Sequence, residues 1–299
     1  MTIVSRDSRE QTEDSFFQKW TSAYDFQIGG TKAFDSDTLN WILNRNGFDS
    51  IDDLAQYISR FPVILDAGCG NGRVLGMLAE LSGRDQMLFG VDLVAADIAQ
   101  KNLNHASNVV VSKADLMDYS TLEHVCRPDL IYCQEVLHHT ADPQISFRNL
   151  VRMLNVGGEI AIYVYKEKAP IREFCDDYVR GQISGLNHDE ASRRMLQFAE
   201  FGKALSNLNI QIDVPEVSIL GISAGSYDLQ RFIYHHFMKC YWNDELTLEQ
   251  NTMINFDWYH PTISSRHSLE EVRSWYVESG LKIIHEYVDE YGITMRGKK

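Results

Sequence analysis

A glycine-rich segment with an acid at its start is the clearest candidate for chemistry in this sequence. The segment Asp66-Ala67-Gly68-Cys69-Gly70-Asn71-Gly72 follows the apolar run 63–65 and precedes an amphipathic stretch, 73–81. Glycine permits positive φ and lets backbone N–H groups approach a ligand, and the start of a helix adds unpaired N–H donors. The carboxylate of Asp66 would discourage a pyrophosphate and favour a cationic ligand. These residues predict a strand, a ligand-binding turn and a helix.

Polar side chains also stand at the ends of three later apolar runs, in Gly90-Val91-Asp92, Ala114-Asp115-Leu116 and Gln134-Glu135. A strand-end acid can accept hydrogen bonds from a ribose diol. The usual dinucleotide pattern has GxGxxG and an acid about 20 residues further on. Here the glycines run GxGxG and an acid stands just before them, so a nicotinamide dinucleotide is the less favoured ligand. Asp92 lies 26 positions after Asp66, a separation that we attribute to the long turn 82–86.

Two histidines, His138 and His139, follow the fourth apolar run. Imidazole titrates near neutrality, so either histidine can serve as a general base. Alternatively, one belongs to a loop and the other only contacts the ligand. Two aromatic-rich patches that contain histidines, 234–237 and 256–261, either line an acceptor pocket or belong to the core. We expect no metal site, because adjacent histidines on a helix point in different directions.

The elements that must position these residues form a β/α alternation over 62–164, which predicts a parallel sheet with helices on both faces. Right-handed crossovers would bring the carboxyl ends of the strands to one edge, where ligands bind. The predicted fold class is α/β, a Rossmann-like doubly wound and mainly parallel sheet of seven strands with the last antiparallel. Two strands within 281–297 close it, after a helix that Ser268 caps and Gly280 ends.

Three regions are expected along the chain. Residues 1–60 form an N-terminal helical segment that packs on the site. Residues 61–165 and 256–299 form the Rossmann-like domain. Residues 166–255 form a mostly helical insertion, a lid over the acceptor. The helices expected outside the glycine segment cover parts of 37–46, 52–59, 145–154, 190–205 and 246–254.

Composition narrows the class of protein. The chain has 42 acidic and 28 basic residues, and its formal charge of −14 would repel nucleic acid. Its five cysteines are scattered and include no CxxC pair, which favours reduced thiols. No stretch approaches the roughly 18 apolar residues of a membrane span, and the first residues lack a signal-peptide core. We expect a cytoplasmic monomer or homodimer without membrane or nucleic-acid partners.

These four elements together resemble the class I S-adenosylmethionine-dependent methyltransferases, whose first motif is an acid followed by alternating glycines. The resemblance covers Ile64 to Tyr165. It implies that S-adenosylmethionine is the cofactor and S-adenosylhomocysteine the product. The positions that it assigns to cofactor binding are Asp66, Gly68, Cys69, Gly70, Asp92, Leu93, Asp115, Leu116, Gln134 and Glu135.

The resemblance also implies individual roles. Asp92 would bind the ribose. Asp115 would bind the adenine amino group, and the backbone N–H of Leu116 a ring nitrogen. Gln134 and Glu135 would lie along the methionine end of the cofactor.

The expected activity is methyl transfer to a small-molecule acceptor in biosynthesis, at a hydroxyl or carboxyl oxygen. Transfer from a sulfonium is an in-line displacement, so orientation supplies most of the acceleration. A hydroxyl acceptor would also need a base. Candidates for the base and for orienting the acceptor are His139, His138, His260, Tyr165 and Tyr259. The alternatives are N- or C-methylation of a metabolite, a protein or RNA methyltransferase, a nicotinamide-dependent oxidoreductase and a non-catalytic cofactor-binding module.

Overall fold

The computed structural model describes residues 6–21 and 37–299, and their contacts divide into two compact units. The sheet unit comprises the described parts of Phe16–Lys166 and Ser265–Lys299. The helical unit comprises the described part of Met1–Ser15 and Glu167–Ser264. Helix α1 (Arg6–Thr21) contributes residues to both. The domain limits predicted from the sequence stay a prediction.

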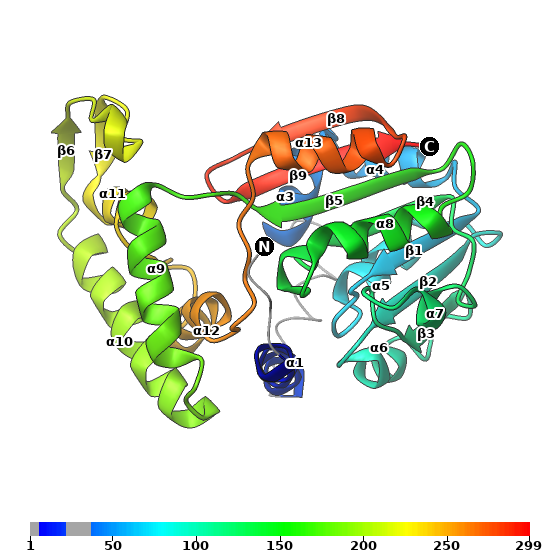
Figure 1. Ribbon diagram of the computed structural model, residues 1–299, viewed down its shortest axis with the longest axis horizontal. Helices are drawn as coiled ribbons and strands as arrows, with labels where there is room; N and C mark the ends of the chain where they lie inside the picture. Colours follow the sequence, from blue (N-terminus) through cyan, green and yellow to red (C-terminus); the bar gives the residue numbers. More distant parts are fainter. Residues whose placement is uncertain (1–5, 22–36) are drawn as a thin grey trace. The chain divides into compact units, whose positions relative to one another are not determined.

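The sheet unit contains a seven-stranded sheet in the order β3-β2-β1-β4-β5-β9-β8 (Figure 1). The strands are β1 (Val63–Ala67), β2 (Met87–Asp92), β3 (Val109–Lys113), β4 (Leu130–Gln134), β5 (Glu159–Tyr165), β8 (Lys282–Val288) and β9 (Gly292–Lys298). Strand β9, the last in the chain, runs antiparallel to both of its neighbours, whereas β1 to β5 are parallel. The predicted Rossmann-like fold is confirmed. Strand order reverses between β1 and β4, the point where ligands bind in such sheets.

Helices cover both faces of this sheet because its strands alternate between two cores. One core joins the sheet to α7 (Tyr119–Leu122), α8 (Pro143–Met153) and α13 (Leu269–Glu278). The other joins it to α3 (Asp37–Asn46), α4 (Ile51–Ile58), α5 (Arg73–Leu81) and α6 (Ala96–Asn102). Along β4, for example, Ile131 and Cys133 belong to the first core and Leu130 and Tyr132 to the second. Because successive side chains of each strand point to opposite faces, the sheet packs against a layer of helices on each face.

Local signals place several element ends where the sequence predicts them. The Ser268 hydroxyl accepts the N–H of Glu271 and begins α13. Gly280, at φ 72°, ends it in the left-handed region. The long turn before β2 is held by Gln86, whose carboxamide accepts from Gly83 N–H and donates to the carbonyls of Ile58 and Phe61.

The helical unit contains α9 (Pro170–Ile183), α10 (His188–Ser206), α11 (Leu229–His236) and α12 (Leu248–Tyr259). It also contains a two-stranded antiparallel sheet, β6 (Gln211–Val214) and β7 (Gly225–Asp228), which the sequence analysis does not predict. These strands have four residues each and little burial, so their hydrophobic pattern is weak. No helix in the described part of the chain is long and apolar enough to cross a membrane.

Candidate functional site

The glycine turn after β1 has the backbone conformation that its composition predicts. Gly68, Gly70 and Gly72 have φ values of 82°, 54° and 88°, in the region that other residues avoid. The N–H groups of Gly68 and Cys69 donate to the carbonyl of Val91 at 2.7 and 3.0 Å. The turn is therefore fastened to the end of β2.

Close neighbours also exclude side chains from this turn. A Cβ on Gly68 would overlap the side chain of Val136, which follows β4. A Cβ on Gly70 would lie 2.7 Å from Cζ2 of Trp20 in α1. The loop after β4 and Trp20 of α1 thus both contact the glycine turn within the sheet unit.

Asp66, the acid before the glycines, is buried at 4% exposure. Its Oδ2 has no hydrogen-bond partner among the residues described. Burial, and then the charge of Asp92, raise the pKa of Asp66 to about 7, although the backbone N–H of Leu75 opposes the shift. A cationic group placed beside Asp66 would favour its ionised form.

Asp92 ends β2 and is already engaged with the backbone. Its Oδ2 accepts the N–H of Gly70 at 2.9 Å, and its Oδ1 accepts the N–H groups of Val94 and Ala95 at 2.9 and 2.8 Å. A carboxylate offers about four lone-pair positions, so one remains on Oδ2. That position can accept a ribose hydroxyl, and the ribose role of Asp92 stays a prediction. Leu93, the next predicted residue, is half-buried.

The loop after β3 carries Asp115 and Leu116. Asp115 Oδ1 accepts the N–H of Met117 at 2.9 Å, and the Asp115 N–H donates to Thr121 Oγ1 at 2.9 Å. The Leu116 carbonyl accepts from Asn149 Nδ2 at 2.9 Å. Helices α7 and α8 therefore hold this loop at the end of its strand.

The end of β4 combines an unsatisfied amide with an unusual backbone. Neither carboxamide atom of Gln134 has a hydrogen-bond partner in the described part of the chain, and both are buried. Glu135 has φ 60°, a left-handed conformation that costs a non-glycine residue of order 1 kcal/mol. Burial lowers the pKa of nearby Arg73, and Glu135 opposes that shift. Strained backbone next to the glycine turn is typical of a ligand site.

His138, His139 and Tyr165 come together at the carboxyl ends of β4 and β5. His138 is fully buried and stacks on Tyr165, with ring centroids 3.7 Å apart. His139 is half-buried and meets Tyr165 edge-on at 5.6 Å. It also meets Phe16 of α1 at 4.8 Å. The structure thus brings three of the five predicted catalytic residues into one cluster of the sheet unit.

The other two, Tyr259 and His260, belong to the helical unit. His260 Nε2 lies 3.2 Å from the Leu186 carbonyl, so it must donate, and Nδ1 accepts from Ser15 Oγ at 2.8 Å. Burial lowers the pKa of His260. Tyr259 is fully buried, and its hydroxyl donates to Asp176 at 2.7 Å. In this arrangement neither side chain is offered to a ligand.

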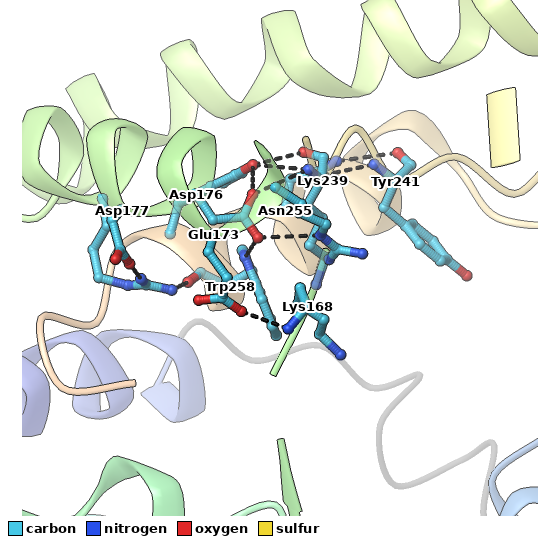
Figure 2. A network of polar contacts seen from close by, with 11 residues as sticks. Lys168, Glu173, Asp176, Asp177, Lys239, Tyr241, Asn255 and Trp258 are labelled. Carbon is cyan, nitrogen blue, oxygen red and sulfur yellow. Dashed lines mark hydrogen bonds and ion pairs between the residues drawn. The ribbon is translucent and has the colours of Figure 1, made fainter. Parts of the chain in front are cut away.

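Asp176 is the centre of a polar network that the sequence analysis misses (Figure 2). It is 1% exposed. Its Oδ1 accepts from the Tyr259 hydroxyl and the Lys239 N–H, and its Oδ2 accepts from Arg172 Nε and Trp258 Nε1. The Arg172–Asp176 pair at i, i+4 is the only local signal of this network in the sequence.

Two buried groups of the sheet unit fit S-adenosylmethionine. Its methionine end carries an ammonium and a carboxylate, and Asp66 Oδ2 and the Gln134 carboxamide are buried groups that can bind such charges. By contrast, the described residues contain no group of three or more His, Cys, Asp or Glu side chains able to hold a metal ion.

Comparison with known proteins finds similarity to methyltransferases. Residues 65–162 match a family model described as a methyltransferase domain. The ubiquinone biosynthesis O-methyltransferase of Rickettsia bellii is 24% identical over 223 residues, 71% of this chain and 85% of that protein. The tRNA U34 carboxymethyltransferase of Sulfurovum sp. is 32% identical over 103 residues, 33% of each chain.

Among solved structures, PKMT2 from Rickettsia typhi in complex with AdoHcy aligns with a TM-score of 0.52 and 14% identity. The alignment covers 79% of this chain and 48% of that one, and it supports the fold. The matched segment 65–162 contains the glycine turn and the ends of β2, β3 and β4. Since this segment and the strand order agree, the chain is a class I S-adenosylmethionine-dependent methyltransferase.

Proposed function

We propose that this enzyme methylates an oxygen atom of a small-molecule acceptor, with His139 as the general base when that oxygen is a hydroxyl. The observation that carries the proposal is the position of His139. The backbone N–H of His139 donates to the carbonyl of Val136, and the side chain of Val136 packs against Gly68 of the glycine turn. The half-buried imidazole of His139 therefore lies one short turn beyond the residue that contacts the glycine turn.

His139 suits this role better than its neighbour. The ring of His138 is fully buried against Tyr165. The ring of His139 retains exposure and is held between His138, at 4.3 Å, and Phe16. The rings of His138, Phe16 and Tyr165 thus orient the His139 imidazole, as a positioned base requires.

The division of work follows from the chemistry. Bound S-adenosylmethionine supplies a methyl group that is already activated for displacement. The residues of this chain then need only hold the cofactor, align the acceptor oxygen and take up its proton. Asp66 and Gln134 serve the first task and His139 the last. A carboxylate acceptor would use the same alignment without the base.

The relatives favour an oxygen acceptor. Several carry the name ubiquinone biosynthesis O-methyltransferase, and the Rickettsia bellii protein is matched over 85% of its length. This supports a small hydroxylated molecule as the acceptor. The cytoplasmic location and the monomeric or homodimeric state stay predictions from the sequence.

The test is a transfer assay with labelled S-adenosylmethionine and a panel of phenols, alcohols, carboxylic acids and amines. With a hydroxyl acceptor, His139→Gln should lower kcat by roughly 100-fold or more and leave S-adenosylhomocysteine binding unchanged. The matched control is His124→Gln, because the side chain of His124 is 87% exposed. Transfer to amines alone, or full turnover by His139→Gln with a phenol, would refute the proposal.

A further inference from the structure

A serine, a histidine and a glutamate contact one another in order beside the carboxyl ends of β4 and β5, all within the sheet unit. The Oγ of Ser265 lies 2.8 Å from Nε2 of His267. On the other side of the same ring, Nδ1 lies 3.1 Å from Oε1 of Glu271. A hydroxyl within hydrogen-bond reach of a base, which a third group orients, is the arrangement that activates a nucleophile. The proposed methyl transfer uses none of these three side chains.

The backbone fixes Ser265 and His267 at this edge of the sheet. The N–H of Ser265 donates to the carbonyl of His138 at 2.8 Å, and the N–H of His267 donates to the carbonyl of Tyr165 at 2.9 Å. His138 follows β4, and Tyr165 is the last residue of β5. The two residues are therefore attached to the ends of two adjacent strands, at the edge where ligands of such sheets bind.

Helix α13 orients the imidazole of His267. This side chain is buried, and its ring meets the Trp275 ring edge-on with centroids 4.9 Å apart. Glu271 stands in the first turn of the same helix, and its side chain is 47% exposed. The contact between Nδ1 and Oε1 is close enough for an ion pair, but its angle departs from that of a hydrogen bond. Catalytic contacts often reach their best angles only when a substrate is bound.

The acid decides which nitrogen of His267 carries the proton. A carboxylate beside Nδ1 favours the tautomer with its hydrogen on Nδ1, so Nε2 keeps the lone pair. Ser265 has one hydroxyl hydrogen and two acceptors within reach, Nε2 at 2.8 Å and the His138 carbonyl at 3.2 Å. The nitrogen is the nearer, so the hydroxyl donates to it. Ser265 is only half-buried, which leaves its hydroxyl accessible to a small molecule.

We propose that Ser265 is a nucleophile for carboxylic esters, with His267 as its general base and Glu271 as the residue that positions the base. Oγ of Ser265 forms a bond to the carbonyl carbon of the ester, and its proton passes to Nε2 of His267. The departing alcohol takes that proton when the ester C–O bond breaks. Water then attacks the acyl group and gives a proton to His267, which returns it to Oγ as the acid leaves. This second activity does not depend on methyl transfer.

A fluorophosphonate probe tests the nucleophile directly, because its phosphorus bonds to an activated serine oxygen as fluoride leaves. Full-length protein would be incubated with the probe, and the labelled peptide identified by mass spectrometry. We expect the adduct on Ser265 and none at this position in Ser265→Ala. His267→Gln should slow labelling by roughly 100-fold or more, since a general base contributes at least that much. Glu271→Gln, at a half-exposed position, should slow it by a smaller factor.

The matched control is Ser274→Ala in the same helix. The hydroxyl of Ser274 is exposed and donates to the carbonyl of Glu271, so its loss should leave the labelling rate of Ser265 unchanged. Calorimetric binding of S-adenosylhomocysteine shows that each variant is folded, and its affinity should match that of the wild type. Hydrolysis of p-nitrophenyl acetate then measures turnover of an ester, which Ser265→Ala should largely abolish.

The outcomes that overturn the proposal are distinct from a failure of methyl transfer. Absence of an adduct on Ser265, or equal labelling rates in wild type, His267→Gln and Glu271→Gln, would refute the activated serine. A protonated His267 paired with Glu271, with the Ser265 hydroxyl turned to the His138 carbonyl, would then account for the contacts. Equal hydrolysis of p-nitrophenyl acetate by wild type and Ser265→Ala would refute the ester chemistry. Loss of methyl transfer to oxygen would leave this proposal standing.

Discussion

The sheet unit and the helical unit build polar sites in opposite ways. In the sheet unit, the groups that fit the cofactor are the side chains of Asp66 and Gln134, and backbone hydrogen bonds hold the loops after the strands in place. In the helical unit, a single buried acid gathers donors from α9, α12 and the segment after α11. The site of the sheet unit consists of short sequence motifs that follow successive strands at one edge of the sheet. The second exists only after distant segments have packed.

The largest effect should come from removing the centre of the helical network. Asp176→Ala leaves Arg172 buried without its partner and should lower the free energy of unfolding by about 3–5 kcal/mol. The matched control is Asp177→Ala. The Asp177 side chain is 60% exposed beside Arg180, so its removal should lower the free energy of unfolding by only about 0–1 kcal/mol. Urea unfolding followed by circular dichroism measures both. Similar losses for the two variants would remove the basis of the comparison.

A glycine pair tests the rigidity of the cofactor turn. Gly68→Ala would combine a strained φ of 82° with overlap of Val136, and should cost about 3 kcal/mol. Gly157 has nearly the same φ, 83°, but open space around its Cα. Gly157→Ala should therefore cost only about 1 kcal/mol. Calorimetry should show S-adenosylhomocysteine affinity falling at least 100-fold in the first variant alone; unchanged affinity would mean that the turn can yield.

Replacing Asp66 or Asp92 with asparagine should change the stability at pH 8 in opposite directions. The pKa of Asp66 in the fold, about 7, lies above its usual 3.8, so its contribution to stability is complete below pH 4 and is lost as pH rises through 7. Asp66→Asn should thus be more stable than the wild type at pH 8 and equal to it at pH 4. Asp92→Asn, which weakens three backbone hydrogen bonds, should be less stable at pH 8. Urea unfolding at pH 4 and pH 8 measures the stability of both variants. A change of stability in the same direction for both variants at pH 8 would contradict this expectation.

The smallest effects compare one helix cap in each unit. Ser268 caps α13 in the sheet unit, and Asn187 caps α10 in the helical unit. Replacing either with alanine should cost about 1 kcal/mol. Scanning calorimetry then shows whether each variant lowers one transition or both. If both variants lower one common transition, the units unfold together and the two regions share their stability.

Sequence reasoning recovers what is encoded locally. The glycine turn, the strand-end acids and the cap at Ser268 are each marked by residue types within a few positions of one another, so they can be found in the sequence. The seven-stranded order follows from the β/α alternation and the closing hairpin. These features predict the fold correctly, and the cofactor roles of the strand-end residues stay predictions.

What the sequence conceals depends on long-range packing. Lys168, Arg231 and Lys239 belong to no basic run, so only the packed unit reveals that they lie beside the rings of Trp258 and Tyr234. Tyr259 and His260 look available for catalysis until their buried bonds to Asp176 and Leu186 are known. Trp20 lies 50 positions from Gly70 in the sequence, and nothing local predicts their contact.

The buried Asp66 ties cofactor uptake to the acidity of the solution. With a pKa of about 7, roughly half of these carboxyl groups hold a proton at neutrality. A cationic cofactor stabilises the ionised form, so its arrival must release that proton to the buffer. Affinity should rise as pH increases through 7, and the heat of binding should change with the ionisation enthalpy of the buffer. Acidification of the solution below pH 7 should therefore weaken the binding of the methyl donor.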